Sequence, residues 1–359
     1  MNLMTIKARR FLLGGILVLC LALIGVFIAV NSHKADKEVE NAFQSMSGFV
    51  LTDQGIEKVE QNSDTLETAM VLEKDNIASF DVVDNKTLVY EVYANKEDTS
   101  KSNIFTYNLD TKKSDNVFAS TETNYFSSLH SLDNGRFGVL ETDDINNVRR
   151  LMIFNVSTGV TENFGSPTKE NFIIDWIPSP DGKHAAFKGV NDDAYVFNIE
   201  DGTSTLIGTF NNQFGFLDNN TIWVTNIEDD KKMSVFNIAS KQSKEVKFAD
   251  GLVNKTFLNG ALLTSSPTEK VIWTTSGFYN SDTASQLVIA TDGTEYSTIY
   301  DLTYNGYKFL SVTPSFDATK QIMSIASTDN YENNVILVID TTTGQLLTTL
   351  FGKQFIYTS

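Results

Sequence analysis

The sequence predicts an all-β domain of repeated four-stranded units, placed behind one apolar N-terminal helix. Three observations support this. Residues 11–30, FLLGGILVLCLALIGVFIAV, contain neither a charge nor a proline. From Gly48 onward the chain changes to short alternating strands broken by Gly, Asn and Asp, without a long helical period. Two hairpin motifs then alternate along the rest of the chain.

The apolar segment has the length that a helix needs to cross a bilayer. Lys7, Arg9 and Arg10 precede it, so the N-terminus is expected to stay in the cytoplasm and the rest to be exported. We therefore expect a single-pass protein of the cell membrane with four parts: a cytoplasmic N-terminus (1–10), a transmembrane signal anchor (11–30), a stalk or linker (31–47) and an extracytoplasmic domain (48–359).

Two alternatives to an uncleaved anchor are weaker. A cleaved signal peptide has a shorter apolar core and a small-residue cleavage site, and Ala29-Val30-Asn31 is a poor one. A lipid-modified cysteine opens a polar region, whereas apolar residues follow Cys20. Cys20 is the only cysteine, so the exported part has no disulfide, which is more usual in a bacterial envelope than in animal secretion.

The charge balance is strongly acidic. The chain has 28 basic and 45 acidic residues, and three of the basic ones precede the apolar segment, which leaves the remainder at about −20. An acidic globule repels phosphate backbones, so nucleic acid is excluded as a partner. The negative charge instead favours the binding of cationic partners and metal ions.

The first motif is an apolar residue, an Asp/Asn/Gly turn and an apolar alternating strand. Asp, Asn and Gly favour such turns because they tolerate positive φ and cap their own backbone. Its six copies are VVDNKTLVYEV (82–92), SLDNGRFGVLET (131–142), SPDGKHAAF (179–187), FLDNNTIWVTN (216–226), FLNGALLTSS (257–266) and SFDATKQIMSIAS (315–327).

The second motif is a buried strand, a polar turn and a further strand. Six copies alternate with the first motif, and FVLTDQGIEKV (49–59) looks like a seventh. The six are IFTYNLDTKK (104–113), LMIFNVSTG (151–159), AYVFNIEDG (194–202), MSVFNIASK (233–241), QLVIATDG (286–293) and ILVIDTTTG (336–344).

Two hairpins in each 40–50 residues are typical of a β-propeller blade of four antiparallel strands. Residues 48–359 suffice for seven blades of about 45 residues, if the hairpin at 49–59 and a last strand at 354–357 close one blade from both chain ends. The alternative is six blades with an extra N-terminal strand pair. Residues 61–76 fit neither motif and are expected to form a loop or a short helix.

SPDGKHAAF, preceded by Trp176-Ile177-Pro178, resembles the repeat of TolB-type propellers, in which a Ser-Pro-Asp-Gly-Lys turn leads into an apolar strand. ILVIDTTTGQLLTTL (336–350) resembles the Asp-x-x-Thr-Gly hairpin of quinoprotein-like propeller repeats. The resemblance covers most of residues 77–350, with one intact copy of the first motif. Because the motif residues in both families are largely structural, the resemblance implies a fold and no activity.

Residues with catalytic chemistry are sparse. The three histidines, His33, His130 and His184, are expected to be structural or exposed. The serine-hydrolase elbow, the His-Glu-x-x-His motif, the Walker loop, the dinucleotide fingerprint and the calcium loop are all absent from the sequence. We therefore assign no catalytic residue, no metal ligand and no cofactor, and a divalent cation stays open without a specific motif.

The order of the hairpins predicts an acidic face. If the strands of a blade are called a to d from the axis outward, the first motif joins a to b and the second joins c to d, on one face. The b–c loops then lie on the opposite face, and three of them contain adjacent acids: Asp143-Asp144, Asp192-Asp193 and Asp229-Asp230. These six residues are the predicted partner-binding site, because gathered like charges attract cations. The alternative is that they are simply solvated loops of an acidic chain.

The sequence thus predicts a membrane-anchored extracytoplasmic β-propeller that acts as a protein-binding or scaffolding module at the cell envelope. One alternative is an enzyme that acts on cell-surface glycan at the axial channel, which requires converging titratable groups. The exported domain has only three arginines, Arg136, Arg149 and Arg150, which argues against anionic sugars. Another alternative is a ligand sensor that works through a membrane partner.

Overall fold

The computed structural model describes residues 46–62, 65–94, 101–132, 135–164, 172–191, 193–226, 232–247, 255–263, 270–277, 287–291, 296–302, 304–309, 315–317, 322–328 and 333–358. The chain divides into two compact units, and apart from residues 61–66 the sheets described below belong to the larger one, Ser47–Glu60 with Glu67–Ser359. All regular structure in these ranges is β-strand. None of them forms a helix that could span a membrane, and the expected anchor at 11–30 lies outside them.

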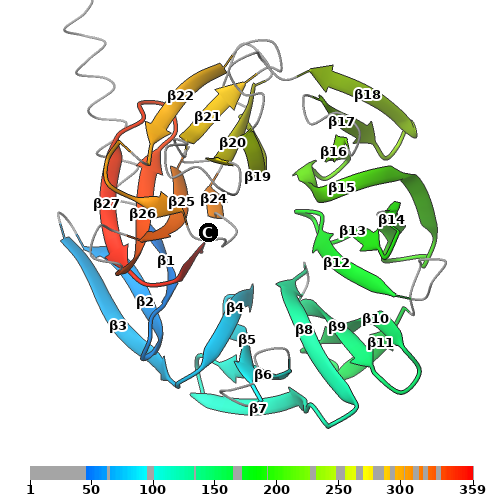
Figure 1. Ribbon diagram of the computed structural model, residues 1–359. Helices are drawn as coiled ribbons and strands as arrows, with labels where there is room; N and C mark the ends of the chain where they lie inside the picture. The colour runs from blue at the N-terminus through cyan, green and yellow to red at the C-terminus, as the bar shows by residue number, and fades with distance from the viewer. Residues whose placement is uncertain are drawn as a thin grey trace, which may run out of the picture. The chain divides into compact units, whose positions relative to one another are not determined.

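The two ends of the chain share one sheet, which we call the terminal sheet (Figure 1). Its order is β28-β1-β2-β3, so the last strand is an inner neighbour of the first. The strands are β1 (Ser47–Leu51), β2 (Gly55–Asn62), β3 (Thr65–Glu73) and β28 (Gln354–Tyr357). The predicted closure of one sheet from both chain ends is therefore confirmed.

The next eight strands form one sheet in the order β11-β10-β9-β8-β6-β5-β4, with β7 paired to β6. It contains two successive four-stranded meanders, joined where Ser102 of β6 pairs with Phe126 of β8. The strands are β4 (Ile77–Asp84), β5 (Thr87–Tyr93), β6 (Ser102–Asn108), β7 (Lys113–Phe118), β8 (Asn124–Ser131), β9 (Arg136–Asp143), β10 (Val148–Asn155) and β11 (Val160–Asn163).

The third sheet runs from β12 to β18 in chain order. Its long strand β15 pairs with β14 through its first half and with β16 through its second half. The strands are β12 (Ile173–Pro178), β13 (His184–Gly189), β14 (Asp193–Asn198), β15 (Ser204–Asp218), β16 (Thr221–Asn226), β17 (Lys232–Asn237) and β18 (Gln242–Lys247).

Two further sheets complete the described residues. One has the order β19-β20-β21-β22, and the other has the order β23-β25-β26-β27, with β24 paired to β25. The strands are β19 (Lys255–Leu263), β20 (Lys270–Gly277), β21 (Leu287–Thr291), β22 (Tyr296–Asp301), β23 (Lys308–Phe309), β24 (Ser315–Asp317), β25 (Ile322–Thr328), β26 (Asn334–Asp340) and β27 (Leu346–Phe351).

Within the larger unit, first strands of successive meanders touch one another. The contacts run from β4 to β8, from β8 to β12, from β12 to β15 and from β15 to β19, and β28 touches both β4 and β24. Figure 1 shows these strands side by side around a common centre, with the later strands of each meander farther out. This arrangement is that of a β-propeller, as the sequence predicts.

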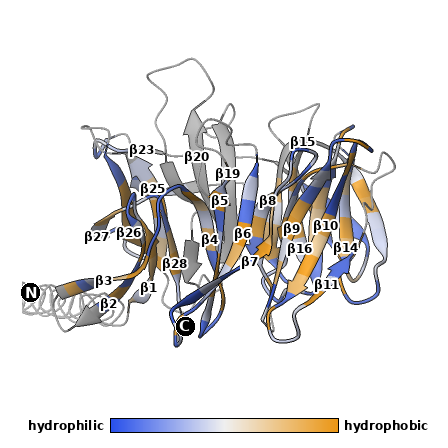
Figure 2. Cartoon of the chain, turned by 90° about the horizontal axis from the view of Figure 1, so that it is seen from below, coloured by the Kyte–Doolittle hydropathy of each residue, from blue (hydrophilic) through white to orange (hydrophobic). Residues whose placement is uncertain are grey.

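The hydrophobic core lies between neighbouring sheets. One cluster joins Leu140 and Leu151 of β9 and β10 to Trp176, Phe187 and Phe197 of the next meander. Trp176 fits there because β9 has Gly138 opposite it, and a Cβ at that position would come within 2.5 Å of the indole. In Figure 2, β9 and β10 carry hydrophobic segments whereas the outer strand β11 is mainly hydrophilic, in agreement with its exposed side chains.

The second motif folds through one repeated capping interaction. The side-chain oxygen of Asn155 accepts hydrogen bonds from the backbone N–H groups of Ser157 and Thr158, and Gly159 follows with φ of +67°. A side chain that caps its own turn in this way replaces missing backbone partners. Equivalent caps are formed by Asn108, Asn198, Asn237 and Asp340.

The first motif is closed by Asp and Ser side chains. Asp181 accepts hydrogen bonds from the Ser179 hydroxyl (2.7 Å) and the Lys183 N–H (3.2 Å), and the Ser179 hydroxyl oxygen accepts one from the His184 N–H. The Ile199 N–H of the β14–β15 turn then donates to the Lys183 carbonyl. Both turn types therefore lie on one side, the turn face, and the b–c loops with the d–a connections lie on the other, the loop face.

Three expectations about the strands were wrong. Residues 65–73 form the outer strand β3 rather than a loop or helix. The hairpin at 49–59 is the middle pair of the terminal sheet, not its outer pair, because β28 lies inside it and β3 outside it. Asn259-Gly260 is not a turn: β19 continues through it with a shift of register between Phe257 and Asn259, an irregularity that Gly readily accommodates.

Gln354 links the closing strand to the following sheet. Its side-chain oxygen accepts from the Phe80 N–H (3.2 Å), and its Nε2 donates to the Phe80 carbonyl (3.0 Å). The side-chain amide thus satisfies both backbone groups of one residue at the inner edge of β4. The substitution Gln354→Ala removes both hydrogen bonds, and we expect it to lower the free energy of unfolding by about 1–3 kcal/mol.

Urea unfolding of the full chain in detergent micelles, followed by tryptophan fluorescence, measures this loss. Gln354→Glu keeps an acceptor for the Phe80 N–H but sets a carboxylate oxygen against the Phe80 carbonyl, so it should also be less stable than the parent. A Gln354→Ala protein as stable as the parent would contradict the closing role.

Candidate functional site

The loop face above β8 to β14 carries a group of side chains that are held in place by hydrogen bonds. Tyr125 at the start of β8 donates from its hydroxyl to Asp144 (3.2 Å), and the Asp144 N–H donates to the Thr123 carbonyl (2.9 Å). Lys101 lies over the Tyr125 ring, 5.4 Å from its centre. Burial raises the pKa of the Tyr125 hydroxyl, and the adjacent Asp144 charge adds to the increase.

Arg149 joins this loop face to the next meander. One terminal nitrogen donates to the Ile174 carbonyl of β12 (2.8 Å) and the other donates to the Ser127 hydroxyl of β8 (2.6 Å). Burial lowers the pKa of this guanidinium, and the nearby Asp175 carboxylate partly offsets that effect. The side chain therefore bridges two inner strands at the rim of the centre.

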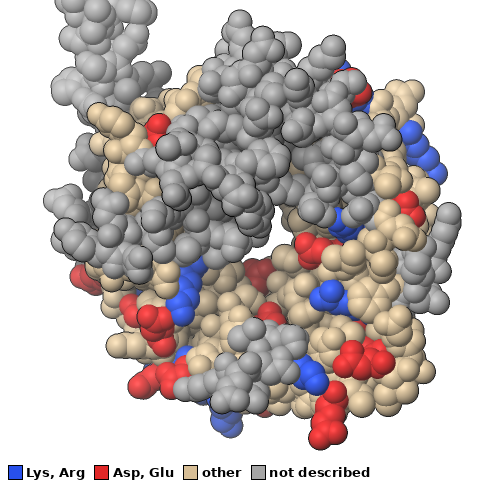
Figure 3. All heavy atoms as spheres, viewed as in Figure 1, with Lys and Arg blue, Asp and Glu red and all other residues tan. Residues whose placement is uncertain are grey.

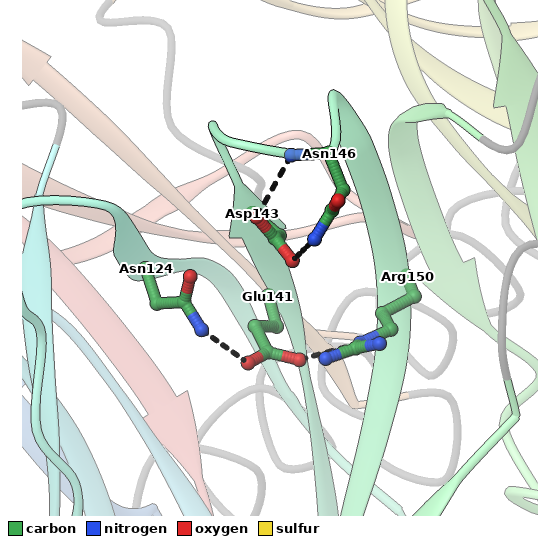
Figure 4. A network of polar contacts seen from close by, with 5 residues as sticks. All are labelled: Asn124, Glu141, Asp143, Asn146 and Arg150. Carbon is green, nitrogen blue, oxygen red and sulfur yellow. Dashed lines mark hydrogen bonds and ion pairs between the residues drawn. The ribbon is translucent and has the colours of Figure 1, made fainter.

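A second network lies beside it (Figure 4). The largely buried Glu141 of β9 accepts from the Arg150 Nε (2.6 Å) and from the Asn124 side-chain amide (3.3 Å). The hydrogen bond to Glu141 raises the pKa of Arg150. Asp143 accepts from the Asn146 side chain (2.7 Å) and from the Asn146 N–H, and the first of these contacts is the main reason for its lowered pKa.

The structure places the predicted acids as follows. Asp143 and Asp144 lie in the β9–β10 loop on the loop face, and each is hydrogen-bonded within that region. Asp193 begins β14 and accepts from the Thr209 hydroxyl (3.2 Å). Asp192, Asp229 and Asp230 lie outside the described residues. With Lys101, Arg149 and Arg150 nearby, the described part of this face carries both signs of charge, as Figure 3 also shows.

Exposed apolar side chains lie on the same face. Ile145 at the tip of the β9–β10 loop is 75% exposed, Val190 in the β13–β14 loop is 49% exposed, and Ile174 at the start of β12 is 38% exposed. We call Tyr125, Asp144, Ile145, Arg149, Ile174 and Val190 together the partner surface. The three aliphatic side chains come from two successive meanders of the loop face, and the hydrogen bond from Arg149 to the Ile174 carbonyl connects those meanders.

A titratable cluster lies on the inner strands. Asp81 of β4, His130 of β8 and Asp175 of β12 are close enough that both carboxylates favour the protonated imidazole. Asp81 accepts from the Ser131 N–H (2.7 Å), and the His130 ring packs edge-on against Trp176, with centroids 5.1 Å apart. Burial nevertheless dominates and lowers the pKa of His130. The described residues contain no cluster of ligands that could hold a metal ion.

The sequence reasoning missed the role of Arg149, Ile174 and this cluster. From the sequence, Arg149 is only one of three arginines of the exported domain, and His130 is expected to be structural or exposed. A usable signal was present: Asp81, His130 and Asp175 interrupt strands that otherwise begin blades with apolar residues. Polar residues at such positions face the centre, where the inner strands of successive sheets approach one another.

The His130 environment predicts a pH dependence. The folded state holds the imidazole neutral below its ordinary pKa of 6.5, whereas the unfolded chain takes up the proton there. Protons therefore favour unfolding. The contribution of His130 to the free energy of unfolding is fully present above pH 6.5, the pKa of histidine in the unfolded chain, and is lost as the pH falls toward the lower pKa of the folded state. His130→Gln should flatten this part of the profile. Melting temperatures between pH 7.5 and 5 measure it, and parallel profiles for the two proteins would contradict the assignment.

Comparison with known proteins agrees with the fold. No protein family matches the sequence, and no curated protein matches it either. Among solved structures, a protein from Lactobacillus plantarum has a TM-score of 0.52 and 14% identity, covering 87% of this chain and 98% of its own. An oligogalacturonate lyase in complex with manganese has a TM-score of 0.50 and 12% identity, covering 75% of this chain and 74% of its own.

A third similar structure is the β-propeller domain of the trilobed protease from Pyrococcus furiosus. Its TM-score is 0.45 and its identity 13%, over 84% of this chain and 93% of its own. At identities this low, the first two likenesses support a shared fold and carry no activity with them. The chain is therefore similar to proteins of this fold and takes its function from its own residues.

Proposed function

We propose that this chain is a β-propeller of seven blades, anchored in a bacterial cell membrane by residues 11–30, which binds a protein partner outside the cytoplasm through the partner surface. The uncharged span and the preceding Lys7, Arg9 and Arg10 support the anchor and its orientation. The seven-blade count is supported by the order of the sheets and by the length of the chain after Gly48.

The observation that carries the proposal is the exposure of three aliphatic side chains, Ile145, Ile174 and Val190, on the loop face of two neighbouring meanders. Exposing large aliphatic groups to water is unfavourable, and a group of them rimmed by polar residues is typical of a protein–protein interface. The other exposed aliphatic or Met side chains of the described residues lie on outer strands: Met70, Val160 and Leu206.

Arg149 and Tyr125 add the polar part of the same surface. Both residue types are enriched among the side chains that dominate interface energies. Their hydrogen bonds to Ser127, Ile174 and Asp144 hold them in place before a partner arrives. A fixed side chain loses less conformational entropy on binding than a free one. Adjacent acids in the loops, Asp143-Asp144 among them, favour a partner with cationic residues at the edge of its contact.

The experiment compares two triple variants of the full-length, tagged protein in native membranes. Ile145→Ser/Ile174→Ser/Val190→Ser changes the partner surface, and Met70→Ser/Val160→Ser/Leu206→Ser makes matched changes on the outer strands. After chemical crosslinking, we expect the yield of the crosslinked complex to fall at least about tenfold in the first variant and to stay unchanged in the second. Loss in both variants, or in neither, would sink the proposal.

An enzyme is the second candidate, favoured by the convergence of Asp81, His130 and Asp175 on the inner strands. A neutral histidine near carboxylates has the composition of a general acid–base site. Incubation with cell-surface glycans, with mass spectrometry of the products, tests this candidate. The enzyme is favoured if products form and His130→Gln abolishes them while partner crosslinking persists. If no glycan gives a product, the enzyme candidate is rejected.

A further inference from the structure

A cleft on the loop face lies where the two ends of the chain meet, away from the partner surface. It has a volume of about 420 Å³, within the range of small-molecule sites. Its walls are the β1–β2 turn, the β27–β28 connection and the start of β26. The lining residues are Thr52, Asp53, Gln54, Glu57, Asn333, Asn334, Phe351, Gly352 and Lys353.

The wall of the cleft holds an exposed aromatic ring. Phe351, the last residue of β27, is 74% exposed. The chain on its C-terminal side is fixed: the Gly352 N–H donates to the Asn334 carbonyl (3.1 Å), and the Lys353 N–H donates to the Leu51 carbonyl (2.7 Å). Gly352 has φ of +157°, and a Cβ there would come within 2.5 Å of the Val50 side chain. The ring is therefore attached to a rigid connection rather than to a long free loop.

The remaining walls present flat polar side chains. Gln54 and Asn334 carry amides that both donate and accept, and the Glu57 carboxylate accepts through two oxygens. Such groups suit a ligand with neighbouring hydroxyls, because each hydroxyl can both donate and accept a hydrogen bond. The Phe351 ring offers an apolar face, which suits a ligand with C–H groups on one side.

The charges of the cleft argue against an anionic ligand. The Asp53 carboxylate is paired with the Lys353 ammonium (2.6 Å) at the rim. The pair is exposed, so it adds little stability, but it leaves no uncompensated cation for an anionic ligand among these lining residues. A ligand that suits these walls has an apolar C–H face, a rim of hydroxyls and no negative charge. A neutral sugar has these properties.

We propose that this cleft binds a neutral oligosaccharide, with one sugar ring stacked on Phe351 and its hydroxyls bonded to Gln54, Glu57 and Asn334. This site is independent of the proposed protein partner, because the partner surface is carried by β8 to β14 and the cleft by the two chain ends. Together they let the protein hold a partner and a surface glycan on one face.

The test is saturation-transfer NMR on the full chain in lipid nanodiscs, prepared without sugar-headgroup detergents, which would compete. The probes are cellotetraose and chitotetraose, and tetraalanine is the peptide probe. We expect one sugar to bind, Phe351→Ala to weaken it at least about tenfold and Phe351→Tyr to retain it. The matched control is Tyr304→Ala, which removes another aromatic ring, 88% exposed, that does not line the cleft.

Several outcomes would overturn the proposal: no binding of either sugar, binding of tetraalanine alone, or equal weakening by Phe351→Ala and Tyr304→Ala. Gln54→Ala/Asn334→Ala provides a second measurement, because loss of the amides should weaken the sugar without removing the aromatic ring. Sugar binding that survives in the triple variant of the partner surface would show that the two sites act separately.

Discussion

The pairing of β28 with β1 is the interaction on which the rest of the structure depends. Gly48 to Leu51 pair with Tyr357 to Gln354, so residues about 300 positions apart form adjacent strands. Without this pairing β1 would expose a sheet edge. Gln354 extends the closure to the next sheet by bonding both backbone groups of Phe80. The inner strands on either side of the closing strand are then in contact with it: β28 touches both β4 and β24.

The partner surface follows from this packing. Trp176 fills the space left by Gly138 between two meanders, and its indole N–H donates to the Ser128 carbonyl (2.8 Å). Ser128 has φ of +55° within a register shift of β8, an arrangement that tertiary contacts must maintain. With the inner strands held in this way, Arg149 can reach Ser127 and the Ile174 carbonyl at once. The packed inner strands thus hold the Arg149 side chain in a fixed position.

Most of the turns were predictable because their chemistry is local. Asn155 and Asp181 bond to backbone groups within a few residues, so the motif alone indicates the turn. Residues 65–73 were not predictable in this way: Leu, Glu, Ala and Met favour helix, yet β3 lies beside β2 and its Val71 carbonyl accepts from the distant Tyr107 hydroxyl. At Asn259-Gly260 the turn residues are present, but pairing with β20 continues the strand.

The amino-acid sequence alone was sufficient for the all-β class, the repeated hairpins and the face of most turns, because these follow from periodicity and short-range turn chemistry. Only the tertiary structure brought Arg149 to Ile174, gathered Asp81, His130 and Asp175, and formed a cleft between Asp53 and Phe351. These residues lie on different meanders or near opposite chain ends. Their proximity depends on how sheets pack and close, and no local pattern encodes which distant residue becomes a neighbour.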